Sequence, residues 1–122
     1  AAVEAFRLIP RETVADRAFL AHLARRGLTE RDGGWVYRFD PAGNGTRLPR
    51  DVWPLLGQIT APTLIIRGEW SPVLPRDTAE RMRAAIPRAS LVEIPGAHHH
   101  VTLDQPHAFV SALTAFLDGI AE

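Results

Sequence analysis

Hydrophobic and polar positions follow two different patterns along the chain, and the pattern changes near Ile59. After that residue, short apolar runs alternate with stretches of helical periodicity, as in a βαβα unit. Residues 62–67 and 91–94 are apolar and rich in β-branched side chains, which is typical of parallel strands covered on both faces. Residues 78–86, between these runs, carry apolar side chains at the spacing of one helix face. The pattern therefore predicts two buried strands joined through a helix.

The last stretch of the chain predicts a helix with one apolar stripe. The stripe consists of side chains that recur at helical spacing: Phe109, Ala112, Leu113, Phe116, Leu117 and Ile120. Strands joined through a helix run parallel with a right-handed crossover, so the loops over residues 68–75 and 95–104 leave the same edge of the sheet. Two parallel strands and their helices cannot cover one another on both faces, and parallel sheets usually contain more strands. We expect the missing strands in a longer chain.

The first half of the chain has a weaker pattern. Thr13, with Asp16 shortly after it, resembles a capping box at the start of an amphipathic helix over residues 12–26. Aromatic side chains then alternate with other residues along a short extended segment: Trp35, Tyr37 and Phe39. Such a face could belong to a lid, although ordinary packing is the more common use of an aromatic stripe. The loop over residues 41–49, rich in proline and glycine, is the best candidate for a boundary. We divide the chain into residues 1–58, mainly helical, and residues 59–122, the βαβα part.

Composition narrows the classes of partner. The 14 Lys and Arg residues balance 14 Asp and Glu residues, so nothing favours nucleic acid, and a small molecule or another part of the same protein is the expected partner. The absence of cysteine excludes a disulfide framework, a thiolate metal site and a cysteine nucleophile. No apolar run is long enough to span a bilayer and no signal peptide is evident, so we predict a cytoplasmic protein with no membrane partner. Met82 is the single methionine and the chain opens at Ala1 in mid-element, which favours a piece of a longer product.

Histidines concentrate in the loop where the second buried strand ends: His98, His99 and His100. The carboxyl edge of a parallel sheet is where ligands gather, and imidazole moves protons near neutral pH. No metal is expected, because adjacent loop residues seldom direct their nitrogens at one ion. Further along, Asp104 is expected to cap the final helix, and His107 to be exposed in its first turn.

The second part of the chain resembles the carboxyl-terminal part of an α/β-hydrolase in three stretches. These read APTLIIRGE (61–69), SPVL (71–74) and IPGAHHHVTLDQP (94–106). The resemblance covers about half of the chain and implies a partial α/β-hydrolase fold, in which residues 62–67 form the penultimate strand. The usual P-G-A-G-H pattern of the family places its catalytic histidine on His99. Residues 1–58 resemble, more weakly, the tail of the helical cap of that family.

The resemblance also implies roles for the neighbours of His99. Trp70 and Val101 flank the proposed site and are expected to line the substrate pocket, although either could equally belong to the core. His98 stands where a glycine is common in the family, and both His98 and His100 are expected to be structural or pocket-lining.

The chain departs from the family pattern at the other catalytic positions. Many relatives carry the triad acid after the penultimate strand, where this chain has Ser71. A hydroxyl cannot stabilise an imidazolium as a carboxylate does, so we expect the acid elsewhere, after the preceding strand, and Glu69 is a poor substitute. The sequence contains no G-x-S-x-G elbow, so the nucleophile is expected upstream of Ala1.

These inferences favour a hydrolase that acts on a small, largely apolar ester, epoxide or haloalkane-like compound, with His99 as general base. No cofactor is needed, because backbone N–H groups near the elbow would hold the oxyanion. We expect the chain alone to be inactive, because it lacks a nucleophile and needs the amino-terminal part of the same hydrolase as its partner. The alternative is a noncatalytic interaction module that binds through the apolar sheet face left uncovered.

Overall fold

The protein is described here by a computed structural model that covers residues 2–40, 43 and 50–121. The chain divides into two compact units, and each is described by itself. One unit comprises residues 1–8 and 15–50, and the other comprises residues 9–14 and 51–122. The predicted boundary loop at residues 41–49 lies outside the described residues, except for Gly43.

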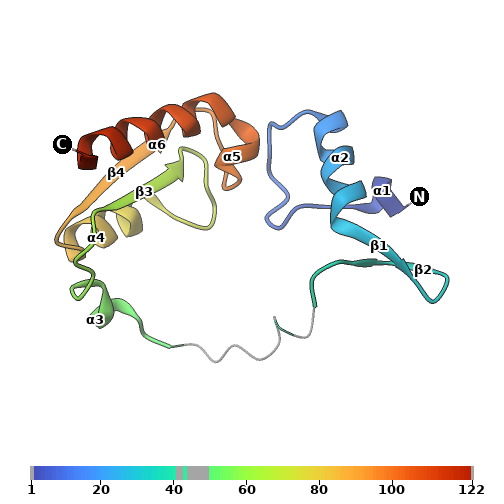
Figure 1. Cartoon of the computed structure of the whole chain (residues 1–122), viewed down its shortest axis with the longest axis horizontal. Coiled ribbons are helices and arrows are strands. Elements are labelled where there is room, and N and C mark those ends of the chain that lie inside the picture. Colours follow the sequence, from blue (N-terminus) through green and yellow to red (C-terminus); the bar gives the residue numbers. More distant parts are fainter. Residues whose placement is uncertain (1, 41–42, 44–49, 122) are drawn as a thin grey trace. The chain divides into compact units, whose positions relative to one another are not determined.

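The first unit is a pair of helices followed by a hairpin. Its elements are α1 (Ala2–Ala5), α2 (Arg17–Gly27), β1 (Leu28–Arg31) and β2 (Gly34–Tyr37) (Figure 1). The strands are antiparallel, with Leu28 opposite Tyr37. Asp32 and Gly33 both have positive φ angles, of 53° and 77°, as a two-residue hairpin turn with the twist of the strands requires. The extended aromatic segment was predicted from the sequence, but its partner strand β1 was not.

The start of α2 differs from the predicted start. The helix begins at Arg17, and its N-cap is Asp16, whose carboxylate accepts the N–H groups of Ala18 (2.7 Å) and Phe19 (3.2 Å). The prediction that the helix begins at residue 12 with Thr13 as its cap is therefore wrong. The Asp16 carboxylate satisfies two of the free N–H groups of the first turn, and residues 9–14 belong to the other unit.

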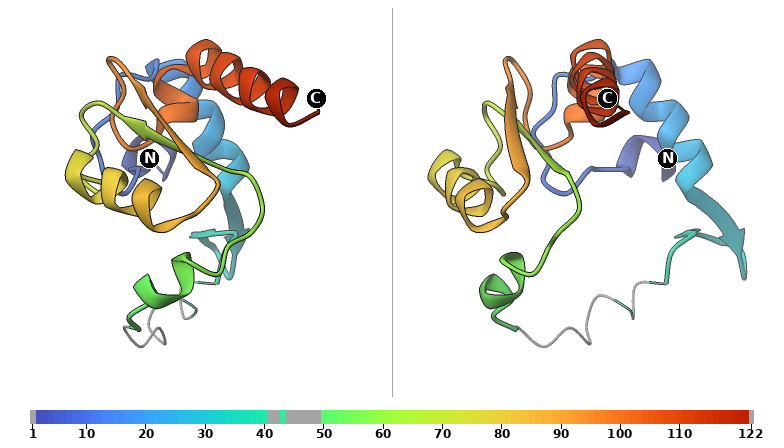
Figure 2. Two further views of the ribbon diagram at one scale, coloured as in Figure 1. Left: turned by 90° about the vertical axis from the view of Figure 1, so that its left-hand side faces the viewer. Right: turned by 60° about the vertical axis from the view of Figure 1, so that its left-hand side comes forward.

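The second unit is built on two parallel strands. β3 (Thr63–Gly68) pairs with β4 (Ala89–Ile94), with Thr63 opposite Ala89 and Gly68 opposite Ile94. The helix α4 (Arg76–Ala85) connects them and packs on both strands, as does α6 (Pro106–Ala121). The two helices lie on opposite faces of the strand pair (Figure 2). The predicted parallel βαβα arrangement is thus confirmed.

The core of this unit lies between the strands and α6. Ile94, Ala97 and Val101 are buried there, and partly buried apolar residues pack against them: Ile66, Val92, Ala108, Phe109 and Ala112. The far end of the predicted stripe is less covered, since Leu117 and Ile120 remain 49% and 48% exposed. Two short helices complete the unit, α3 (Trp53–Leu56) and α5 (Val101–Asp104). None of the helices within the described ranges has both the length and the apolar character to cross a bilayer.

Candidate active site

The loops that leave the carboxyl ends of β3 and β4 lie side by side. Backbone hydrogen bonds continue past the strands: the Glu69 N–H donates to the Ile94 carbonyl (3.0 Å) and the Trp70 N–H to the Ala97 carbonyl (2.9 Å). Parallel pairing brings both strand ends to one edge, and these bonds hold the two loops together there. We call residues 69–75 the serine loop and residues 95–100 the histidine loop.

Gly68 permits this close approach. A Cβ atom at this position would lie 1.9 Å from the carbonyl oxygen of His98 and 2.5 Å from that of Ala97. Both are backbone atoms, so no side-chain rotation could relieve the clash. In the histidine loop, Gly96 has a φ of +67°, a conformation that glycine adopts without strain. The two glycines therefore set the path of the histidine loop across the end of β3.

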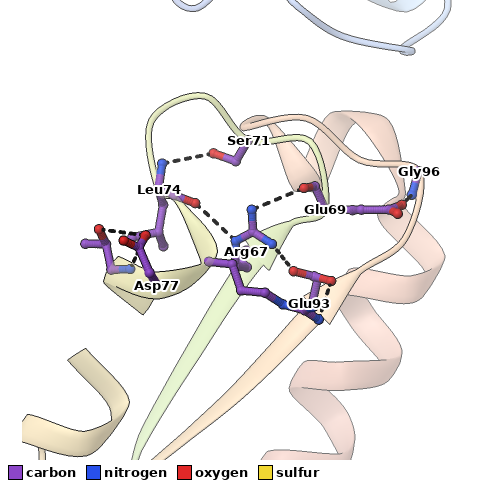
Figure 3. Close-up of polar contacts among 9 residues, drawn as sticks. Arg67, Glu69, Ser71, Leu74, Asp77, Glu93 and Gly96 are labelled. Carbon is purple, nitrogen blue, oxygen red and sulfur yellow. Dashed lines mark hydrogen bonds and ion pairs between the residues drawn. The ribbon is translucent and has the colours of Figure 1, made fainter. Parts of the chain in front are cut away.

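Arg67, near the end of β3, holds the serine loop in place. Its guanidinium group is buried, and its Nε and Nη2 groups donate to the carbonyls of Leu74 and Glu69, both at 3.1 Å. Its Nη1 group pairs with the carboxylate of Glu93 on β4, which also accepts from Arg76 at 2.9 Å (Figure 3). One side chain thus fixes both ends of the serine loop. An arginine at the end of an apolar strand is the sequence signal that could have identified this anchor.

His99 and Ser71 meet where the two loops face each other. The Nδ1 atom of His99 lies 3.2 Å from the Oγ atom of Ser71. Ser71 is only 8% exposed, and its Oγ atom also accepts the N–H of Leu74 at 3.2 Å. The imidazole ring of His99 is exposed. Ser71, which the sequence resemblance places at the position of the family's acid, thus contacts one ring nitrogen of His99.

The neighbouring histidines have contacts of their own. The ring of His98 packs against the half-exposed ring of Trp70, with centroids 5.3 Å apart. The Nε2 group of His100 donates to the Pro10 carbonyl at 2.8 Å, since a carbonyl oxygen can only accept. The rings of His99 and His100 meet edge to face at 5.6 Å. In the described part of the chain, no group of His, Cys, Asp or Glu residues is arranged to hold a metal ion.

An open hollow of about 310 Å³ adjoins His99. Its lining mixes polar and apolar side chains: Ile9, Ile66, His99, His100, Val101, Thr102 and Phe109. Val101, one of the two expected pocket residues, is in this lining, whereas Trp70, the other, is not. A larger hollow of about 590 Å³ lies along β2 in the other unit, and no histidine lines it.

Two carboxylates of this region have roles that the sequence did not reveal. Glu69 accepts the N–H of Gly96 at 2.9 Å, so it ties the serine loop to the histidine loop. Asp104 is buried and accepts the N–H of His98 at 2.7 Å and the N–H of Val14 at 3.0 Å. The prediction that Asp104 caps the final helix is therefore wrong, because its carboxylate bonds to earlier segments. No local sequence signal announces contacts of such long range.

Comparison with known proteins places the chain in one family. Residues 1–112 match the Alpha/beta hydrolase family. The 2-(acetamidomethylene)succinate hydrolase of Mesorhizobium japonicum is 32% identical over 71 residues, which is 58% of this chain and 26% of that protein. Protein ABHD14A of Rattus norvegicus is 40% identical over 60 residues, which is 49% of this chain and 24% of that protein.

A solved structure extends the similarity to three dimensions. The crystal structure of E-2-(acetamidomethylene)succinate hydrolase matches with a TM-score of 0.73 and 28% identity, over 85% of this chain and 40% of that one. This chain therefore spans about a quarter of the length of the curated relatives and less than half of that structure.

Proposed function

Since this chain belongs to the α/β-hydrolase family, we propose that it supplies the general base of a hydrolase, and that His99 is that base. One observation carries the proposal: the Nδ1 atom of His99 lies 3.2 Å from the buried hydroxyl of Ser71, while the exposed ring borders the hollow. An imidazole held at one nitrogen and open at the other has the arrangement that base catalysis needs.

The proton accounting follows from the two ring nitrogens. When the Nδ1 atom of His99 carries the proton and donates it in a hydrogen bond to Ser71, the Nε2 atom keeps its lone pair. It removes the proton from the nucleophile, or from water that attacks an ester intermediate, and later delivers it to the leaving group. The neutral Ser71 holds the ring but adds no negative charge, so a triad acid from another segment remains part of the proposal.

The substrate we propose is a small, largely apolar ester, epoxide or haloalkane-like compound. Ile66, Val101 and Phe109 form the apolar part of the mixed lining of the hollow beside His99, where the apolar part of such a compound would lie. Hydrolysis as the reaction class is supported by the relative named 2-(acetamidomethylene)succinate hydrolase. Independence from a cofactor, a cytoplasmic location, and the division into a cap tail (1–58) and a core part (59–122) remain predictions of the sequence.

The test is a histidine scan in a hydrolase chain that contains these residues and a nucleophile elbow, which we call the elbow-containing chain. His99→Ala should lower kcat/KM for p-nitrophenyl acetate by about 10²- to 10⁴-fold, the usual contribution of a general base. His107→Ala, at an exposed site on α6, is the matched control and should leave the rate unchanged. Retention of most activity by His99→Ala would remove His99 from the mechanism. The 122-residue chain alone should show negligible turnover.

A noncatalytic interaction module is the second candidate. The half-exposed Leu117 and Ile120 on α6 favour it, because neighbouring exposed apolar side chains often mark a contact surface. Under the hydrolase proposal, the isolated chain should self-associate or give poorly dispersed NMR signals. A well-dispersed, inactive monomer would favour the module instead.

A further inference from the structure

Asp104 is the meeting point of three hydrogen-bond donors from two distant parts of the chain. Its Oδ1 atom accepts the N–H of Val14 at 3.0 Å and the hydroxyl of Thr13, and its Oδ2 atom accepts the N–H of His98 at 2.7 Å. Asp104 is only 8% exposed. Burial of a carboxylate is unfavourable unless donors surround it, and here the donors are supplied by backbone and side chain together. The carboxylate therefore joins residues 13–14 to the histidine loop.

A second tie holds the same segment at its other end. Residues 9–14, which we call the strap, belong to the β3–β4 unit although they are remote from it in sequence. The carbonyl of Pro10 accepts the Nε2 proton of His100 at 2.8 Å. Ile9, at the start of the strap, borders the hollow that contains His99 and is 90% exposed. The strap is thus tied to the histidine loop near both of its ends. Pro10 bonds directly to His100. Thr13 and Val14 bond to Asp104, which in turn bonds to His98.

We propose that Asp104 is a positioning residue that holds the histidine loop and the strap in one arrangement, so that the strap forms a wall of the substrate site. The proposal rests on the proposed function of His99. Asp104 fixes the backbone at His98, directly before the base, and through Thr13 and Val14 it fixes the strap. The apolar side chain of Ile9 then faces the part of an ester that is not hydrolysed.

The chemistry of the site predicts how substitutions act. Asp104→Asn replaces one acceptor oxygen with an NH₂ group, and the backbone N–H that faces this group, that of Val14 or that of His98, loses its hydrogen bond. Thr13→Val keeps the shape of the side chain and removes the hydroxyl alone. Thr13→Ser restores the hydroxyl and is the conservative rescue. Asp118→Asn removes the same charge from an exposed site on α6 and is the matched control.

Hydrogen–deuterium exchange of the elbow-containing chain tests the arrangement without reference to activity. Asp104→Asn should speed exchange of the His98 or the Val14 amide by about tenfold, because the NH₂ group replaces the acceptor of one amide, and the other amide keeps only an uncharged acceptor. Thr13→Val should speed exchange in the strap and also in the histidine loop, and Thr13→Ser should restore both. Asp118→Asn should match the wild type. If Asp104→Asn does not fold, the Thr13 pair decides the question alone.

Kinetics with p-nitrophenyl butyrate provide the second readout. Thr13→Val should raise KM several-fold while kcat changes by less than about twofold, because the wall moves while the contact with Ser71 still holds His99. Faster exchange confined to the strap, or an unchanged KM, would overturn the proposal. If His99→Ala loses activity but Thr13→Val gives one of these overturning results, the role of Asp104 is rejected and that of His99 is kept. Failure of the Asp104 proposal is thus distinguishable from failure of the His99 proposal.

Discussion

Two regions of the molecule depart from the usual rule that apolar side chains are buried and polar ones exposed. They are the pair formed by the serine and histidine loops, and the β1–β2 hairpin. Polar groups are buried in the loops and in the elements beside them, since Ser71 of the serine loop, Arg67 of β3 and Asp104 of α5 are each less than a tenth exposed. The hairpin exposes apolar groups, and Trp35 on β2 is 59% exposed. Among the described residues, no buried side-chain nitrogen or oxygen lacks a hydrogen-bond partner. The loops are therefore specified by polar contacts between distant segments, whereas the hairpin is specified by local backbone register.

The difference teaches where each region is sensitive to substitution. A buried polar contact is lost completely when one partner is removed, because the other is left unsatisfied. An exposed aromatic ring loses little, because water already surrounds much of it. Substitutions in the two loops and at the end of β3 that supports them should thus be far more damaging than substitutions in the hairpin, and the following variants measure that difference.

Gly68→Ala should have the largest effect. Its new Cβ atom would clash with the backbone oxygens of Ala97 and His98, so the histidine loop must move or the unit fails to form. We expect a loss of about 3 kcal/mol or more in the free energy of unfolding, measured by urea denaturation of the elbow-containing chain. Gly119→Ala on α6 is the control: its Cβ atom meets open space, and a gain of about 0.5 kcal/mol is expected. Equal stability of the two variants would refute the close approach.

Arg67→Met should come next. It removes the buried partner of Glu93 and frees both ends of the serine loop, at a cost of about 3 kcal/mol in the free energy of unfolding. Arg83→Met removes an exposed ion pair with Glu80 on α4 and should cost less than about 0.5 kcal/mol. Thermal melting of both variants measures the contrast. A loss for Arg67→Met as small as that of the control would show that the loop does not depend on the guanidinium.

Ser71→Ala should have an intermediate effect, visible mainly in catalysis. It removes the partner of His99 Nδ1 and the acceptor of the Leu74 N–H, so kcat should fall about tenfold with KM nearly unchanged. Ser71→Thr keeps the hydroxyl and should recover part of the rate. Ser90→Ala, at an exposed serine of β4, is the control and should behave as the wild type. A fall in rate for the control equal to that for Ser71→Ala would remove Ser71 from the site.

The same contrast explains how far the sequence could predict the structure. The apolar runs of residues 62–67 and 91–94 predicted both parallel strands, because the pattern of each run is local. The P-G-A-H pattern located the histidine loop for a similar reason, since its turn depends on a glycine at positive φ. Local patterns are sufficient where neighbouring residues determine the conformation.

Contacts between distant segments were not predictable in this way. Thr13 and Asp16 matched a capping rule, yet the hydroxyl of Thr13 bonds to Asp104. Asp104 likewise matched a capping rule, and bonds to the strap and the histidine loop. The same local sequence pattern can surround a residue that caps a helix and a residue that joins two distant segments. Only the tertiary arrangement distinguishes the two roles.

Trp35→Thr should have the smallest effect and completes the comparison. The indole is mostly exposed, and threonine also suits a strand, so the free energy of unfolding should change by less than about 0.5 kcal/mol. Tyr37→Ala is the matched variant in the same strand. It removes ring contacts with Phe6 (6.3 Å) and Phe39 (5.0 Å) and should cost about 1 kcal/mol. A loss for Trp35→Thr above that of Tyr37→Ala would mean that the indole is covered in the working protein, and the hairpin would then be a contact surface.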